Sequence, residues 1–298
     1  MAQNGYPTVL TAETTISQST QRPSQLALMN PSGEALKIHE IRFTLKDTTA
    51  RAFSITGGTI GCKLDLGSVA LTKGFIPVWN FGRVLSYDQD LNNQFTWRLA
   101  HPIYVPAGGV LLPNFQSFGQ VYTPITARIT YFGVSVTEQL PKRVFLPWVS
   151  AYVGKAFPYD TAGTDASNET DLLNPFDQDL VISRLVGRFN IFNADSTVNL
   201  SRVGGQLLSV RAALSNGDPL VRTETPFVQV FGEEGRAWEQ RNTILKPKQY
   251  FQLYVTKLAA SNETSPGSTL QPYVSMVGYR TMDLVAYNNA VLASPGAA

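Results

Sequence analysis

The chain has 298 residues, of which 43% are hydrophobic and only 15% are charged, and its formal net charge is +2. Soluble domains usually carry about 25% charged residues, so this composition is typical of a protein whose surface is partly covered by other protein. The small net charge does not predict binding to nucleic acid or to a membrane surface, and Cys62, the only cysteine, excludes an intrachain disulfide.

The N-terminal segment 1–25 is rich in Ser, Thr and Gln and carries only Glu13 and Arg22 as charges. Such a composition cannot bury enough apolar surface to fold alone. We therefore expect a flexible N-terminal arm over 1–25 that a neighbouring molecule orders. The segment has no basic start and no apolar core, and the chain has no run of about 18 apolar residues, so we expect no signal peptide, no membrane-spanning segment and synthesis in a cytoplasm.

Strand patterns dominate the rest of the chain. In "IHEIRFTL" the apolar residues Ile41, Phe43 and Leu45 alternate with polar ones, and "QYFQLYVTK" at 249–257 alternates in the same way. Turn formers separate these runs, as at 106–109 and 215–219. "GQLLSVRAALSNG" at 205–217 fits a short helix ending at Gly217 and a strand equally well. The pattern predicts an all-β protein with many short strands.

Two segments of the chain share one outline. "LMNPSGEALKI" at 28–38 and "LLNPFDQDLVI" at 172–182 match at Leu, Asn, Pro, Leu and Ile, 144 residues apart. Asn-Pro is typical of a turn, and the apolar residues after it are typical of a strand. Each copy therefore predicts a turn that leads into a strand.

Further landmarks recur in the same order. Trp97 and Trp238 are each followed nine residues later by a proline, "LGSV" at 66–69 matches "LLSV" at 207–210, and Gly133 matches Gly278. The offset stays between 141 and 145 residues. Any β protein shares some turn and strand vocabulary, but collinear matches favour a duplicated unit. The duplicated tryptophans fit two copies of one core better than sugar-stacking platforms.

The segment between the two halves is apolar and aromatic at first and polar afterwards, unlike a solvent-exposed linker. We expect a connector at 141–170 that packs in a cleft or against another subunit. Its apolar residues are our candidates for a subunit interface: Pro147, Trp148, Tyr152, Phe157 and Tyr159.

Candidate catalytic and metal-binding residues are few. His39 and His101 are the only histidines, and no zinc motif, nucleophile elbow or phosphate-binding loop accompanies them. Asp218 and the pair Glu233-Glu234 could supply carboxylates for glycoside hydrolysis, but glycines flank that pair and favour a turn. We expect no catalytic residues, no cofactor and no metal site, and therefore no enzyme.

A second acidic stretch, "DQDLNN" at 88–93, resembles the start of a calcium-binding loop. An EF-hand loop needs Gly at its sixth position and Glu at its twelfth, and here these are Asn93 and Leu99. A solvated turn is the better interpretation, although a looser calcium site remains open.

The paired openings at 28–38 and 172–182, with the paired Trp-to-Pro segments, divide the chain into two similar β units. In this organisation the sequence resembles the double jelly-roll major capsid proteins of tailless icosahedral viruses, which include bacteriophages and often enclose a membrane. The resemblance implies an all-β fold of two tandem eight-stranded jelly-roll β-sandwiches with few short helices. It places the first roll at 26–140, the connector at 141–170, the second roll at 171–285 and a C-terminal tail at 286–298.

The resemblance also implies a function. Such subunits form homotrimers that act as pseudo-hexameric capsomers and tile an icosahedral shell, so the expected location is the virion. Expected partners are further copies of the chain, minor capsid or penton proteins and an internal membrane, without sequence-specific binding of nucleic acid. The alternatives are a secreted or cell-surface two-sandwich protein that binds or cleaves carbohydrate, and a phage spike or minor capsid component.

Overall fold

The computed structural model describes residues 6–17, 24–47, 60–81, 83–87, 92–118, 124–137, 140–158, 161–192, 198–199, 207–231, 237–258 and 269–293. These residues divide into two compact units. The first unit comprises Met1–Trp148 together with Tyr279–Ala298, and the second comprises Val149–Gly278. Strands β12 and β21 therefore have residues in both units.

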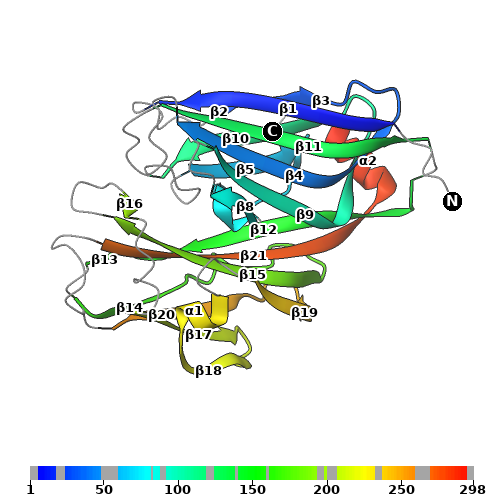
Figure 1. Cartoon of the computed structure of the whole chain (residues 1–298). Helices are drawn as coiled ribbons and strands as arrows, with labels where there is room; N and C mark the ends of the chain where they lie inside the picture. Colours follow the sequence, from blue (N-terminus) through cyan, green and yellow to red (C-terminus); the bar gives the residue numbers. More distant parts are fainter. Residues whose placement is uncertain are drawn as a thin grey trace. The chain divides into compact units, whose positions relative to one another are not determined.

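Two antiparallel sheets build the first roll (Figure 1). The first sheet has the order β1-β11-β4-β9-β8, and the second has β2-β10-β5-β6 with β3 and β7 added. The strands of the first sheet are β1 (Pro7–Ile16), β4 (Ala35–Asp47), β8 (Arg83–Tyr87), β9 (Asn92–Val105) and β11 (Ile125–Val136). Those of the second are β2 (Ser24–Gln25), β3 (Leu28–Met29), β5 (Ile60–Leu66), β6 (Val69–Ala70), β7 (Ile76–Pro77) and β10 (Val110–Ser117).

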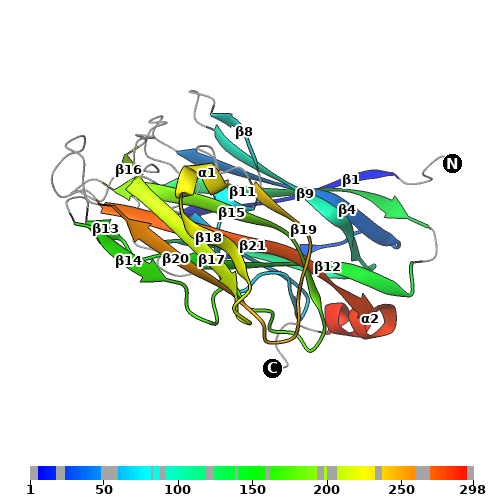
Figure 2. The same cartoon turned by 90° about the horizontal axis from the view of Figure 1, so that it is seen from below.

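The second roll repeats this plan. Its first sheet has the order β12-β21-β15-β16, in which β19 also pairs with β15 and β13 with β21, and its second sheet has the order β14-β20-β17-β18 (Figure 2). The strands of the first sheet are β12 (Arg143–Val153), β13 (Phe157–Pro158), β15 (Leu180–Phe192), β16 (Val198–Asn199), β19 (Ala237–Leu245) and β21 (Thr269–Asp283). Those of the second are β14 (Gly163–Ala166), β17 (Leu208–Leu214), β18 (Pro219–Pro226) and β20 (Phe251–Lys257).

The two plans correspond strand for strand. The order β1-β11-β4-β9 in the first roll matches β12-β21-β15-β19 in the second, and β2-β10-β5-β6 matches β14-β20-β17-β18. Four strands facing four, with neighbours in the sheet that are distant in sequence, is the jelly-roll arrangement. The chain is thus all-β with two tandem jelly rolls. The described helices are short: the 3₁₀-helix η1 (Val78–Asn80), α1 (Phe227–Phe231) and α2 (Leu284–Leu292).

Each core is filled by the inward-facing residues of period-two strands. In β4 the predicted residues Ile41, Phe43 and Leu45 are fully buried, and in β20 Phe251, Leu253 and Val255 are fully buried. Trp97 is 2% exposed, and its ring lies 5.2 Å from that of Phe81. The core interpretation is therefore correct for Trp97, whereas the side chain of Trp238 lies outside the described part of the structure.

Segments of weak or ambiguous pattern become strands and a helix. Residues 208–214 form β17, so the strand alternative holds and the helical one is wrong. Residues 7–16, expected in a flexible arm, form β1 and pair along their whole length with β11. The expected connector supplies β12, β13 and β14, which are strands of sheets. The expected tail contains α2, which begins at the N-cap Asp283.

Helix α2 packs on the first roll. The N–H and hydroxyl groups of Ser68 both donate to the carbonyl of Ala290, at 3.1 and 2.7 Å, and the buried Tyr287 donates to the carbonyl of Tyr104. A side chain at Gly67 would collide with the backbone of Val291, so this glycine permits the close approach of the helix.

Candidate functional site

The Asn-Pro motif that repeats in the sequence forms the same buried corner in both rolls. In the first roll Asn30 is 2% exposed, and its side-chain amide donates to the carbonyls of Glu34, at 2.9 Å, and Val105, at 3.0 Å. Its side-chain oxygen accepts the N–H of Ser32 at 3.0 Å. One side chain thereby joins the loop after β3 to the end of β9.

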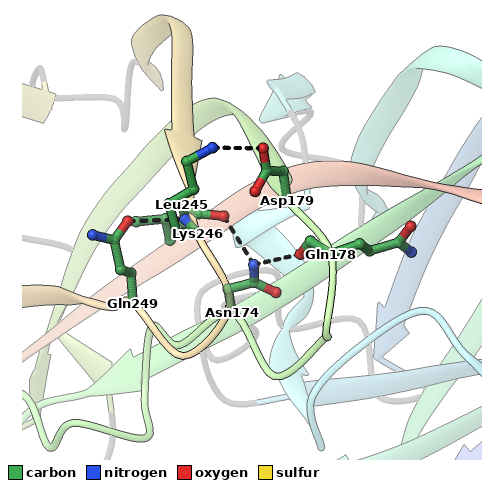
Figure 3. Close-up of polar contacts among 6 residues, drawn as sticks. All are labelled: Asn174, Gln178, Asp179, Leu245, Lys246 and Gln249. Carbon is green, nitrogen blue, oxygen red and sulfur yellow. Dashed lines mark hydrogen bonds and ion pairs between the residues drawn. The ribbon is translucent and has the colours of Figure 1, made fainter.

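Asn174 does the same in the second roll (Figure 3). It is fully buried and donates to the carbonyls of Gln178, at 2.8 Å, and Leu245, at 2.9 Å, and it accepts the N–H of Phe176 at 3.0 Å. Gln178 and Phe176 lie 144 residues after Glu34 and Ser32, their counterparts in the first roll, and Asn174 lies 144 residues after Asn30. Only Leu245 has a different spacing from its counterpart, Val105. The motif is structural: it satisfies buried carbonyls and carries no chemistry.

The turn that faces each corner is also conserved between the rolls in its geometry. Asn30 donates its backbone N–H to the carbonyl of Gly109, and Asn174 donates to that of Gln249, both at 2.9 Å. The third residue of this turn has positive φ in both rolls: Gly108 at 74° and Lys248 at 63°. The left-handed conformation costs a lysine more than a glycine, so the second roll keeps the turn despite local strain.

A second shared feature is a glycine where two strands approach closely. A Cβ at Gly133 would lie 2.7 Å from the carbonyl oxygen of Lys37, and a Cβ at Gly278 would lie 2.7 Å from that of Val181. Lys37 and Val181 are again 144 residues apart. The matched glycines therefore mark equivalent positions of the two rolls.

The structure confirms the match of Trp97 with Trp238, but the prolines that follow them are not equivalent. Trp97 pairs with Ile41, and Trp238 pairs with Leu185, 144 residues later. Between Trp97 and the following turn β9 contains one more residue at its bulge than β19 does. Consequently the structural counterpart of Pro106 is Lys246 and not the expected Pro247.

The match of "LGSV" with "LLSV" is wrong. Leu66 ends β5 opposite Leu111, whereas Leu207 precedes β17. The residue that ends β17 in the equivalent place, opposite Phe251, is Leu214. The two strings resemble each other because both contain apolar strand residues beside a small polar one.

The residues considered for catalysis do not converge. His39 is exposed on β4, whereas His101 stacks on Phe145 with ring centroids 4.0 Å apart and contacts the edge of Tyr279. Partial burial lowers the pKa of His101, so the ring is neutral over a wider range of pH. Asp218 closes a turn with Asn216. In the described part of the chain no group of three or more His, Cys, Asp or Glu side chains could hold a metal ion.

Two other acidic candidates cannot be placed. Asp88 and Asp90 of the calcium-like stretch, and the pair Glu233-Glu234, lie outside the described residues. Cys62 is buried, and burial raises the pKa of its thiol, so it is not a reactive thiolate.

The five candidate interface residues belong mainly to the core. Pro147, Trp148, Tyr152 and Phe157 are buried within the chain, and Tyr159 lies outside the described residues. The hydroxyl of Tyr152 donates to the carboxylate of Asp165 at 2.6 Å, and both burial and this carboxylate raise its pKa. Aromatic residues in a predicted connector indicated contact with other groups, but these groups lie in the same chain.

The exposed apolar side chains are therefore the remaining candidates for contact with another molecule. Several large apolar side chains are exposed on each unit. They are Tyr6, Val9, Met29, Phe118, Phe145, Val285 and Leu292 in the first unit, and Val153, Ile244 and Leu258 in the second. None of the described helices has the length and hydropathy to cross a membrane.

The class that this architecture defines is the double jelly-roll proteins. Neither a protein-family model nor a curated protein sequence matches the chain. Among solved structures, the STIV major capsid protein matches with a TM-score of 0.53 at 12% identity, over 95% of this chain and 98% of that one. This chain has the double jelly-roll fold, and the similarity extends along almost its whole length.

Two other viral proteins match less closely. VP54 of PBCV-1 has a TM-score of 0.49 at 12% identity and covers 94% of this chain and 95% of its own. The major capsid protein P2 of bacteriophage PM2 has a TM-score of 0.42 at 10% identity and covers 92% and 98%. The fold assignment depends on the STIV protein and on the strand topology described above.

Proposed function

We propose that this chain is the major structural subunit of an icosahedral viral shell, with no enzymatic activity, and that it functions as a homotrimer. The observation that carries the proposal is the presence of two rolls with the same strand order and the same buried Asn corner in one chain. Three such chains around a three-fold axis present six similar rolls, which is the shape required at a six-neighbour position of a shell.

The composition supports an assembled state. Only 15% of the residues are charged, and interfaces between subunits are depleted of charge at their centres. Large exposed apolar residues such as Val9, Val285 and Leu292 offer surface for such contacts. The described residues form no metal cluster, and the fold is that of a major capsid protein.

The proposed location is the virion, with synthesis in the cytoplasm of the host. The proposed partners are further copies of the chain, then minor capsid or penton proteins, and an internal membrane where the virus has one. Sequence-specific binding to nucleic acid is not part of this proposal.

Native mass tests the proposal. Size-exclusion chromatography with light scattering is expected to give a trimer of about 98 kDa, three times the 32.6 kDa chain, and electron microscopy is expected to show closed shells at higher concentration. A stable monomer that binds or hydrolyses a glycan would contradict the proposal and favour the carbohydrate-active alternative.

A further inference from the structure

Strand β1 has one edge that no described strand covers. It pairs with β11 from Pro7 to Ile16 and ends the sheet on that side. In Figure 1 this strand, in blue, lies at the margin of its sheet. An uncovered edge presents a row of backbone N–H and C=O groups that can bind another strand.

The pairing shows which groups face outward. The carbonyl of Tyr6 accepts the N–H of Ser135 at 3.0 Å, so Tyr6 bonds toward β11. Bonding positions alternate along an antiparallel strand. The odd-numbered residues therefore direct their backbone groups away from β11, and the N–H and C=O groups of Val9, Thr11 and Glu13 are not paired with any described strand.

This edge lacks the features that usually block strand addition. Its pairing with β11 is free of bulges, it has no proline after Pro7 and no lysine, and its only charge, Glu13, is paired with Arg128 at 2.7 Å. Natural edges are normally protected by charges, prolines or bulges.

The comparable strands of the second roll are protected. Strand β12, the counterpart of β1, has Pro147 in its middle, and most of its side chains are buried. Strand β18, an edge of the other sheet, is bulged against β17, has Pro219 and Pro226 at its ends and carries Arg222 and Glu224. The same chain therefore blocks these two strands and leaves the ten-residue edge of β1 open.

We infer that β1 pairs in antiparallel orientation with β1 of a second copy of this chain, around a two-fold axis at Thr11. This register sets the free groups of Val9 against those of Glu13 from the other copy, and it sets the two Thr11 residues against each other. The outward groups of Val9, Thr11 and Glu13 are then all paired, Thr15 donates its N–H to the carbonyl of Pro7, which has no N–H to return, and the two sheets become one continuous sheet.

Charge favours this register. Glu13 is the only charged residue of β1, and with the axis at Thr11 it lies opposite Val9, which is 56% exposed. With the axis at Glu13 the two carboxylates would lie opposite each other, and like charges opposite each other destabilise a sheet. The edge is thus self-complementary for a second copy, whereas it offers no charge to attract a charged partner.

In the proposed shell this contact would have a role in joining trimers, and that role alone rests on the proposed function. A trimer interface closes on itself and cannot by itself extend a lattice, whereas a two-fold contact between trimers can. In the shell, β1 pairing would therefore join neighbouring trimers.

Cysteine cross-linking tests the register. Paired residues have Cβ atoms about 5 Å apart, so two copies of Thr11→Cys are expected to be joined by a short thiol-specific cross-linker. Thr15→Cys is the matched control, because its two copies would lie eight residues out of register, about 26 Å apart. The wild-type protein controls for cross-linking through Cys62, which is buried. Equal cross-linking of both variants, or of neither, would overturn the inference.

Assembly tests the role of the edge. Thr11→Pro removes an outward N–H and keeps every backbone bond to β11, at the loss of the exposed side-chain bond from Thr11 to Thr130, and Val9→Lys places a charge on the edge. Both are expected to keep the trimer and to weaken association between trimers at least tenfold. Thr223→Lys is the control, because it adds the same charge at an exposed position of β18, and it is expected to assemble as the wild type does.

The outcomes separate the two proposals. If trimers form and both edge variants assemble like the wild type, β1 pairing is wrong and the shell function stands. If the wild type never trimerises but Thr11→Cys cross-links selectively, the shell function is wrong and β1 pairing stands.

Discussion

At the scale of single residues, the two rolls are held by the same few polar groups. Asn30 donates to three backbone carbonyls and Asn174 to two inside an otherwise apolar corner. A buried carbonyl without a partner costs about 1–3 kcal/mol. These amides therefore stabilise the corners chiefly by preventing that cost.

Replacement of Asn174 measures this contribution. Asn174→Ala is expected to lower the free energy of unfolding by about 3 kcal/mol, as read from urea denaturation. Asn216→Ala is the control, because Asn216 makes two hydrogen bonds in the same unit but is exposed, and its replacement is expected to cost under about 0.5 kcal/mol. Equal effects of the two substitutions would show that the corner is not a point of stability.

At the scale of elements, the least predictable one is α2. Its sequence, "LVAYNNAVL", has no charge, and Asp283 caps it by accepting the N–H groups of Val285 and Ala286. A helix of nine residues is not stable alone in water. Its docking on the first roll, through Tyr287 and Val291, is therefore what keeps it folded.

A pair of glycines isolates that docking. Gly67 and Gly74 both have positive φ, 54° and 68°, but only at Gly67 would a Cβ meet α2. Both substitutions by alanine are expected to cost about 1 kcal/mol of backbone strain. Gly67→Ala is expected to cost more and to accelerate amide hydrogen exchange throughout α2, whereas Gly74→Ala leaves exchange in α2 unchanged. Unchanged exchange in both variants would mean that Gly67 does not govern the docking.

At the scale of the whole molecule, the order of the chain does not match the order of its units. Tyr279–Ala298 follow the second roll in sequence but belong to the first unit. The last residues of the chain thus stabilise the roll that was synthesised first. The two rolls share a plan, but among the described residues only the first has a helix of this kind.

Truncation tests this assignment. A chain that ends at Asp283 loses the buried side chains of Tyr287 and Val291, which is expected to destabilise the first unit by about 3 kcal/mol. Hydrogen exchange is expected to increase in β5, β6 and β10 and to remain unchanged in β17 and β18. Faster exchange confined to the second unit would contradict the assignment of α2 to the first.

Much of the fold is local and could be predicted. The alternation around Phe43 and around Leu253 specifies strands because it creates one apolar face, whatever the partner strand is. The Asn-Pro motif marked the duplication correctly, since the same buried corner needs the same amide. Four of the five interface candidates are buried within the chain, because aromatic composition shows that a residue will be buried, but not by which chain.

The sequence by itself determined that the chain is all-β, that it contains a unit twice, and that Asn30 and Asn174 are equivalent. Only the tertiary structure decided where each unit begins. Residues 7–16 have no core-forming pattern, yet they become a strand because β11, more than 100 residues away, supplies their hydrogen-bond partners. The first roll therefore begins at β1 and the second at β12, and "LMNPSGEALKI" and "LLNPFDQDLVI" are corners inside the rolls. Strand pairing is a long-range interaction, and the residues on one strand do not specify which distant strand will bind it.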